Sequence, residues 1–166
     1  SAVPSESVAA TATPFQEIAG VEQAEAAPGR AHDDVLQYEF EELPPWGGTH
    51  SPIWQNCGIY QNPVRPENAI HSLEHGAVWI TYQPDMAEND VEAVREQIRD
   101  RSFVLMSPYP NQRSPLILTA WGVRLELDSV TDERIERFVD YFEAGPQTPE
   151  PGAACQGGLS FTVEDS

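Results

Sequence analysis

The chain has 166 residues, with 27 acidic and 9 basic side chains and a formal net charge of −18. This charge repels phosphate backbones and anionic lipid surfaces, so we expect neither nucleic-acid binding nor peripheral membrane binding. The length allows one compact domain plus a tail. No apolar run approaches the roughly 18 residues that span a bilayer, so we expect no direct membrane insertion of this chain. Every basic residue is arginine, which fits either a salt-adapted surface or a coding bias.

The N-terminal part of the chain changes character twice. Residues 1–34 are rich in Ala, Glu, Ser, Thr and Pro, the composition of an acidic linker or tether. Residues 35–40 alternate as a strand would. Residues 43–66 are dense in Pro and Gly, which predicts a long loop. Long irregular segments inside compact domains are usually functional or disordered, and the large apolar side chains here argue against disorder.

The rest of the chain reads as alternating strands and helices. Strands are predicted at 76–82 and 103–106, and a longer strand at 115–127 with Gly122 marking a bulge or a close backbone approach. Amphipathic helices are predicted at 85–101 and 131–143.

These elements predict an α+β fold with a small mixed or antiparallel sheet, two helices and one long Gly/Pro-rich loop. We expect three regions: a linker at 1–34, a single globular metal-binding domain at 35–156, and a C-terminal tail at 157–166.

Two cysteines, Cys57 and Cys155, lie in irregular segments at opposite ends of the predicted domain. A disulfide between them would staple the tail to the long loop and would indicate an oxidising, extracytoplasmic compartment, either secreted, periplasmic or anchored outside the cytoplasmic membrane. A thiolate metal pair or two free thiols are the alternatives, but the spacing matches no short metal-ligand motif.

The histidines are the strongest chemical signal. His71 and His75 are spaced so that a helical turn would place both on one face, where they can bind one metal ion. His50 precedes them in the Gly-rich loop, and Met106 ends a predicted strand. Three imidazoles and a thioether suit copper as both Cu(I) and Cu(II). The alternative is that the histidines are structural and Met106 is core packing.

The same segment also reads as His-x-x-Glu-His, a zinc-protease signature in which Glu74 would be the general base. That mechanism needs a long helix and a third ligand, whereas Gly76 ends the motif at once. We therefore expect Glu74 to orient a histidine or to pair with an arginine. His32, beside two aspartates, is expected to be solvated.

Several blocks of sequence resemble the domain-of-unknown-function 3105 family. They are Pro-Pro-Trp-Gly-Gly-Thr-His at 44–50, Asn-Cys-Gly-Ile-Tyr at 56–60, His-Ser-Leu-Glu-His-Gly at 71–76, Ser-Pro-Tyr-Pro at 107–110 and Thr-Ala-Trp-Gly at 119–122. Members are secreted or membrane-anchored prokaryotic proteins, so the resemblance implies an extracytoplasmic domain. It supplies no established reaction.

Three functions follow as hypotheses. The first is a mononuclear copper-binding protein for carriage, delivery or one-electron transfer, with His50, His71, His75 and Met106 as ligands and an exported or membrane-bound copper acceptor as partner. The second is a zinc hydrolase. The third is a disulfide-stapled interaction domain without metal, with Trp46, Trp54 and Tyr60 as its recognition surface. A ligand set without an open position favours carriage over catalysis.

Overall fold

The computed structural model describes residues 18–163. The fold is α+β, as predicted, although the sheet is larger than expected and the described residues include a third helix, Pro66–Glu74, beside the two predicted ones. In the described part of the chain the strands are β1 (Glu22–Gln23), β2 (Gly58–Ile59), β3 (Val78–Tyr82), β4 (Val104–Pro108), β5 (Leu116–Ala120) and β6 (Val123–Leu127), and the helices are α2 (Pro66–Glu74), α3 (Glu88–Ile98) and α4 (Arg134–Phe142).

The six strands form one mixed sheet in the order β1-β6-β5-β3-β4-β2. β3 and β4 run parallel because α3 carries the chain back between them, while β5 pairs with both β3 and β6 in antiparallel fashion. The predicted single strand at 115–127 is wrong in one respect: it is a hairpin. Trp121 and Gly122 form its turn, and Gly122 adopts a φ of +74°, which glycine accepts without a steric penalty.

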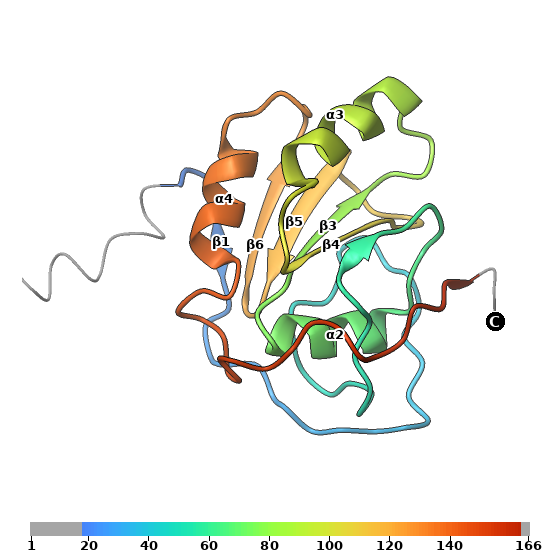
Figure 1. Cartoon of the computed structure of the whole chain (residues 1–166), viewed down its shortest axis with the longest axis vertical. Helices are drawn as coiled ribbons and strands as arrows, with labels where there is room; N and C mark the ends of the chain where they lie inside the picture. The colour runs from blue at the N-terminus through green and yellow to red at the C-terminus, as the bar shows by residue number, and fades with distance from the viewer. Residues whose placement is uncertain (1–17, 164–166) are drawn as a thin grey trace, which may run out of the picture.

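The two faces of the sheet carry separate apolar clusters. On one face, α3 and α4 pack over Ile80 and Met106; on the other face, α2 packs over Trp79 and Leu105. Neighbouring residues of a strand point to opposite faces of the sheet. The paired residues Ile80 and Met106 therefore lie in one cluster, and the pair Trp79 and Leu105 lies in the other. Figure 1 shows α2 lying apart from α3 and α4. Helices on both faces explain why β3, β4 and β5 are fully buried.

The predicted strand at 35–40 does not form. The backbone N–H of Tyr38 donates to the Glu67 carboxylate over 3.1 Å, and its carbonyl accepts from Arg65 over 2.8 Å. Side chains at the start of α2 therefore take the place of a strand partner. The aromatic rings of Tyr38 and Phe40 still pack against the cluster beneath α2.

Both regions expected to flank the domain contact it where they are described. Ile18 is buried in the core, and β1 pairs with β6. At the other end, Leu159 forms a bridge with Gln55. The first seventeen residues of the predicted linker lie outside the described residues.

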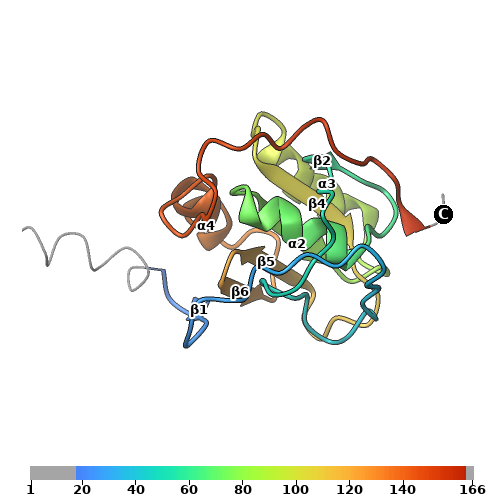
Figure 2. The same cartoon turned by 90° about the horizontal axis from the view of Figure 1, so that it is seen from below.

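The disulfide between Cys57 and Cys155 is present, with the two Cα atoms 5.4 Å apart. It fixes the C-terminal segment, which runs from α4 back across the domain (Figure 1, Figure 2). This bond suggests an oxidising environment. Among residues 18–163, no helix has the length and apolar character needed to cross a membrane.

Candidate metal site

Helix α2 positions the central side chains of the site. Pro66 stands in its first turn, where the missing N–H costs nothing, and the helix ends at Glu74, with His75 as its C-cap. After the helix, Gly76 adopts a φ of +111°, and β3 begins two residues later. His71, Glu74 and His75 consequently share one side of the helix, because residues three and four apart lie above one another.

Three of the histidines are held by backbone carbonyl oxygens. The Nδ1 atoms of His50, His71 and His75 each lie 2.7 Å from a carbonyl, those of Gly48, Ser51 and Ala154 respectively. A carbonyl can only accept, so each Nδ1 carries the proton and donates. In the neutral imidazole, Nε2 is then left as a lone pair. This pattern fixes the tautomer and ring orientation of metal-ligating histidines.

Three imidazoles surround one oxygen of Glu74. The Nε2 atoms of His50, His71 and His32 lie 3.3, 3.7 and 4.0 Å from Glu74 Oε1. The four side chains form a group that could hold a metal ion, with one ligand atom from each lying within 4.8 Å of the others. Ligands in a tetrahedron around an ion with bonds of about 2.1 Å stand about 3.4 Å apart. The spacing of this group is therefore close to that of a metal site.

Burial and charge keep these donors in their metal-binding forms. Burial lowers the pKa of His71, with the neighbouring His75 and His50 adding to the effect, so the imidazole is neutral at pH 7. For Glu74, burial acts to raise the pKa, but the hydrogen bond from Arg30 and nearby positive charge outweigh it and leave the pKa below the usual value. The carboxylate is therefore ionised.

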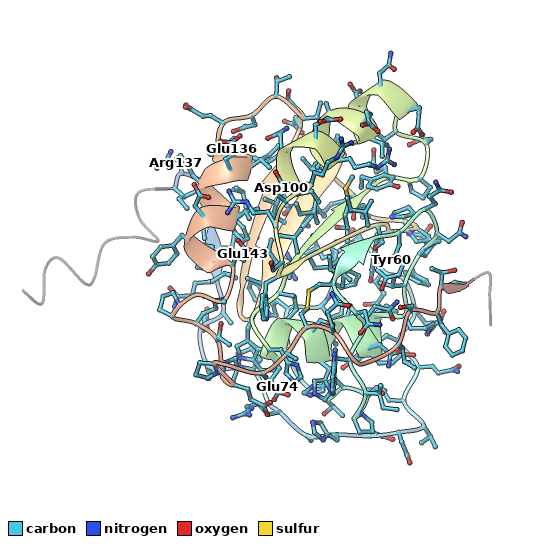
Figure 3. The ribbon with its side chains drawn as sticks, viewed as in Figure 1. Tyr60, Glu74, Asp100, Glu136, Arg137 and Glu143 are labelled. Atoms are coloured by element: carbon cyan, nitrogen blue, oxygen red, sulfur yellow. A yellow bond between two sulfur atoms is a disulfide. The ribbon has the colours of Figure 1, made fainter. Side chains whose placement is uncertain are left out.

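The second oxygen of Glu74 faces an arginine. Arg30 Nε donates to Glu74 Oε2 over 2.7 Å, and Arg30 Nη2 donates to Glu150 Oε2 over 2.8 Å. The Arg30 side chain is 48% exposed whereas Glu74 is 1% exposed, so the arginine closes the site on its solvent side. Figure 3 shows Glu74 at the end of α2, near the C-terminal segment.

His75 belongs to a second group, formed with Glu74 and Glu150. Its Nε2 lies 3.4 Å from Glu150 Oε1, and its ring meets that of His71 edge-on at 4.7 Å between centroids. The backbone N–H of Glu150 donates to the Glu74 carbonyl over 3.2 Å, which holds this part of the C-terminal segment against α2.

The sequence hypothesis and the structure differ over three residues: Met106, His32 and His75, which lies in the second group and not in the first. Met106 packs on the face of the sheet covered by α3 and α4, whereas α2 lies on the opposite face. A methionine in a buried strand here serves packing. His32 was expected to be solvated, and its side chain is 46% exposed, but it also reaches the site because its backbone bridges to His50. The only signal for His32 in the sequence is that histidine is scarce, since the chain has just four histidines.

Glu74 has the partners that the sequence suggested, an arginine and a histidine. The three aromatic residues of the interaction hypothesis have partners within the chain. Trp54 packs against His71 and His75, the Trp46 ring lies 4.2 Å from the Arg124 guanidinium carbon, and the Tyr60 hydroxyl donates to the Asn56 carbonyl.

A family model described as a protein of unknown function, DUF3105, matches residues 32–157 of this chain. The match begins at His32 and includes both cysteines and the other three histidines. No curated protein and no solved structure is significantly similar to the chain.

Proposed function

The chain belongs to the DUF3105 family, whose description assigns no function, and from its own residues we propose that it is an extracytoplasmic protein that binds one Cu(II) ion. His32, His50, His71 and Glu74 are the proposed ligands. The observation that carries the proposal is the convergence of imidazole Nε2 atoms on a buried carboxylate oxygen, with the shortest separation 3.3 Å.

Electrostatics supports a cation at this point. With Nδ1 of His50 and His71 donating to carbonyls, the neutral rings direct lone pairs toward the charge of Glu74. Such an arrangement is repulsive unless a proton or a metal ion lies between the atoms. The low pKa of His71 argues against a proton on that ring, and a divalent ion would satisfy all four donors at once.

The donor set favours Cu(II) among the candidate metals. Three nitrogens and one oxygen bind first-row divalent ions in an order that peaks at copper, with zinc below it. Without the Met106 thioether the site loses the soft ligand that stabilises Cu(I), so we propose carriage or sequestration rather than electron transfer. An ion would enter beside His32, whose side chain is 46% exposed while His50 is fully buried.

The zinc-hydrolase alternative has less support. A general base needs a carboxylate facing water and substrate, but one Glu74 oxygen is enclosed by imidazoles and the other is paired with Arg30. Carriage requires a partner that donates copper to the protein or accepts copper from it, and we include such a partner in the proposal.

Titration of metal-free protein with Cu(II) and Zn(II), followed by calorimetry and EPR, tests the proposal. We expect one tight Cu(II) equivalent with nitrogen hyperfine structure, and affinity at least about a hundredfold lower in Glu74→Gln and His71→Ala, since even indirect partners of a metal contribute ten- to a hundredfold. Glu136→Gln, which alters an exposed acid on α4 (Figure 3), is the matched control and should bind as wild type.

Two results would overturn parts of the proposal. Tighter binding of zinc than of copper in direct competition would remove copper and leave a metal site. Absence of stoichiometric binding of either ion, or retention of the tight equivalent in a His50→Ala/His71→Ala variant, would remove the site itself.

A further inference from the structure

Glu74 also belongs to a second set of metal donors, with His75 and Glu150. His75 Nε2 lies 3.4 Å from Glu150 Oε1, and these two side chains form a group with Glu74 whose ligand atoms lie within 4.8 Å of one another. His75 is 5% exposed, and its Nδ1 is committed to the Ala154 carbonyl. Its Nε2 is therefore another fixed imidazole lone pair, like those of the first group.

Arg30 stands between the two carboxylates of this second group. Its guanidinium donates to Oε2 of Glu74 and to Oε2 of Glu150, over 2.7 and 2.8 Å. One positive charge thus lies between the two carboxylates. The buried Glu74 carboxylate needs a compensating cation, and here an arginine of the chain supplies it.

The Arg30 side chain has space into which it can withdraw. It lines an open cleft of about 490 Å³ that also includes Trp121, Gln147 and Pro149. The side chain is 48% exposed and is not part of the apolar core, so the cleft offers room for the guanidinium if an ion displaces it. Glu150, with a side chain 38% exposed, gives the second group access to solvent, as His32 does for the first group.

We propose that Glu74, His75 and Glu150 form a second, weaker divalent-cation site for which Arg30 is a built-in competitor. This inference rests on the proposed function, because Glu74 would then bridge two ions, with Oε1 toward the histidine site and Oε2 toward the second ion. Carboxylate-rich two-metal centres hold their ions about 3.5–4 Å apart. The site would be empty at low metal concentration and would fill when Arg30 is displaced.

The competition has a clear physical basis. A second ion must break two charge-assisted hydrogen bonds of Arg30, which are stronger than bonds between neutral groups. Neutralising residue 30 removes the competitor and also lowers the positive charge opposing a second ion. The second binding step should therefore tighten by a larger factor than the first, because Arg30 bonds Oε2 of Glu74 and Oε2 of Glu150, whereas Oε1 of Glu74 faces the histidines.

Cu(II) titrations of Arg30→Gln and wild type test this site, using aqueous Cu(II) as the probe. We expect the second equivalent to bind at least about tenfold more tightly in Arg30→Gln, with a loss of EPR intensity as two nearby spins couple. Trp54 lies 4.8 Å from His75, measured between ring centroids, so its fluorescence should be quenched further at the second step. His75→Ala and Glu150→Gln in the Arg30→Gln background should abolish this step and keep the first equivalent.

The outcomes separate the two proposals. One tight equivalent with no second step in Arg30→Gln would overturn the second site and leave the proposed function standing. Loss of the first equivalent from every variant and from wild type would overturn the proposed function. A second step that survives in both His75→Ala and Glu150→Gln would be adventitious surface binding. Circular dichroism establishes that each variant is folded. Glu150→Gln should disturb packing least, because the Glu150 side chain is 38% exposed.

Discussion

Replacing Cys57 and Cys155 together by alanine should remove a large part of the stability of the domain. The bond joins residues separated by 98 positions. In the chain-entropy relation, a cross-link of this span removes about 16 cal/mol/K from the unfolded chain, or about 4.7 kcal/mol at 25 °C. Domains of ordinary size are stable by about 5–15 kcal/mol, so roughly a third or more of the free energy of unfolding depends on this bond.

Urea denaturation followed by tryptophan fluorescence measures the effect. With a dependence of about 1–3 kcal/mol per molar urea, the midpoint should fall by at least about 1.5 M. Both proteins should be metal-free, because an ion bound only by the folded state adds its own stabilisation. Wild type kept in reductant is the control and should match the double variant. A loss below about 1 kcal/mol would refute the entropic reasoning.

Three further predictions concern the core, the site and the turn after α2. Met106→Leu should leave Cu(II) affinity unchanged and cost less than about 1.5 kcal/mol, since it conserves core volume; loss of copper binding would return Met106 to the ligand set. The folded-state pKa of His71 lies below its usual value of about 6.5, so metal-free protein should lose stability as pH falls below that value. The folded-state pKa of Glu74 is lowered from 4.5, so wild type should lose further stability as pH falls below that value. The Glu74→Gln variant should lack this second loss of stability. Urea melts across pH measure both effects, and a flat profile from pH 7 to 5 would contradict the first. Gly76→Ala should cost about 1–3 kcal/mol more than Gly152→Ala in thermal or urea melts, because both have positive φ but only at Gly76 would a Cβ meet backbone, at 2.9 Å. Equal costs would show that the close approach does not matter.

The regular elements other than α2 and the two-residue strands β1 and β2 were predictable because their signals are local. The apolar periodicity of the segments that became α3 and α4 follows from 3.6 residues per turn, and the β-rich run before Pro84 could hardly be anything but a strand. The hairpin at Trp121 and Gly122 was missed because an apolar alternation continues through a two-residue turn. The strand expected at 35–40 failed because its backbone is satisfied by Glu67 and Arg65, which lie distant in sequence.

The site was predictable only in part, for a related reason. His71 and Glu74 share a helix, so their spacing in the sequence carries geometric information, and His50 lies in a loop that its composition marks as functional. Arg30 and His32 come from a segment whose composition resembles a linker, and their position depends on a backbone bridge to His50. Met106 had the right chemistry, but a sheet face cannot be assigned before the register of the strand is known.

The order of the donors along the chain also sets an order in time. During synthesis the four proposed ligands, His32, His50, His71 and Glu74, emerge before strands β3 and β4, against which α2 packs in the finished fold. Glu150 follows Glu74 by 76 residues. At 5–20 residues per second this interval is about 4 to 15 s. A nascent chain thus presents three borderline imidazoles and one hard carboxylate in an open, unselective form, and affinity alone would let the most competitive available ion bind first. Under the proposed function, the metal content of the compartment in which folding is completed would decide the occupant as much as the finished geometry does.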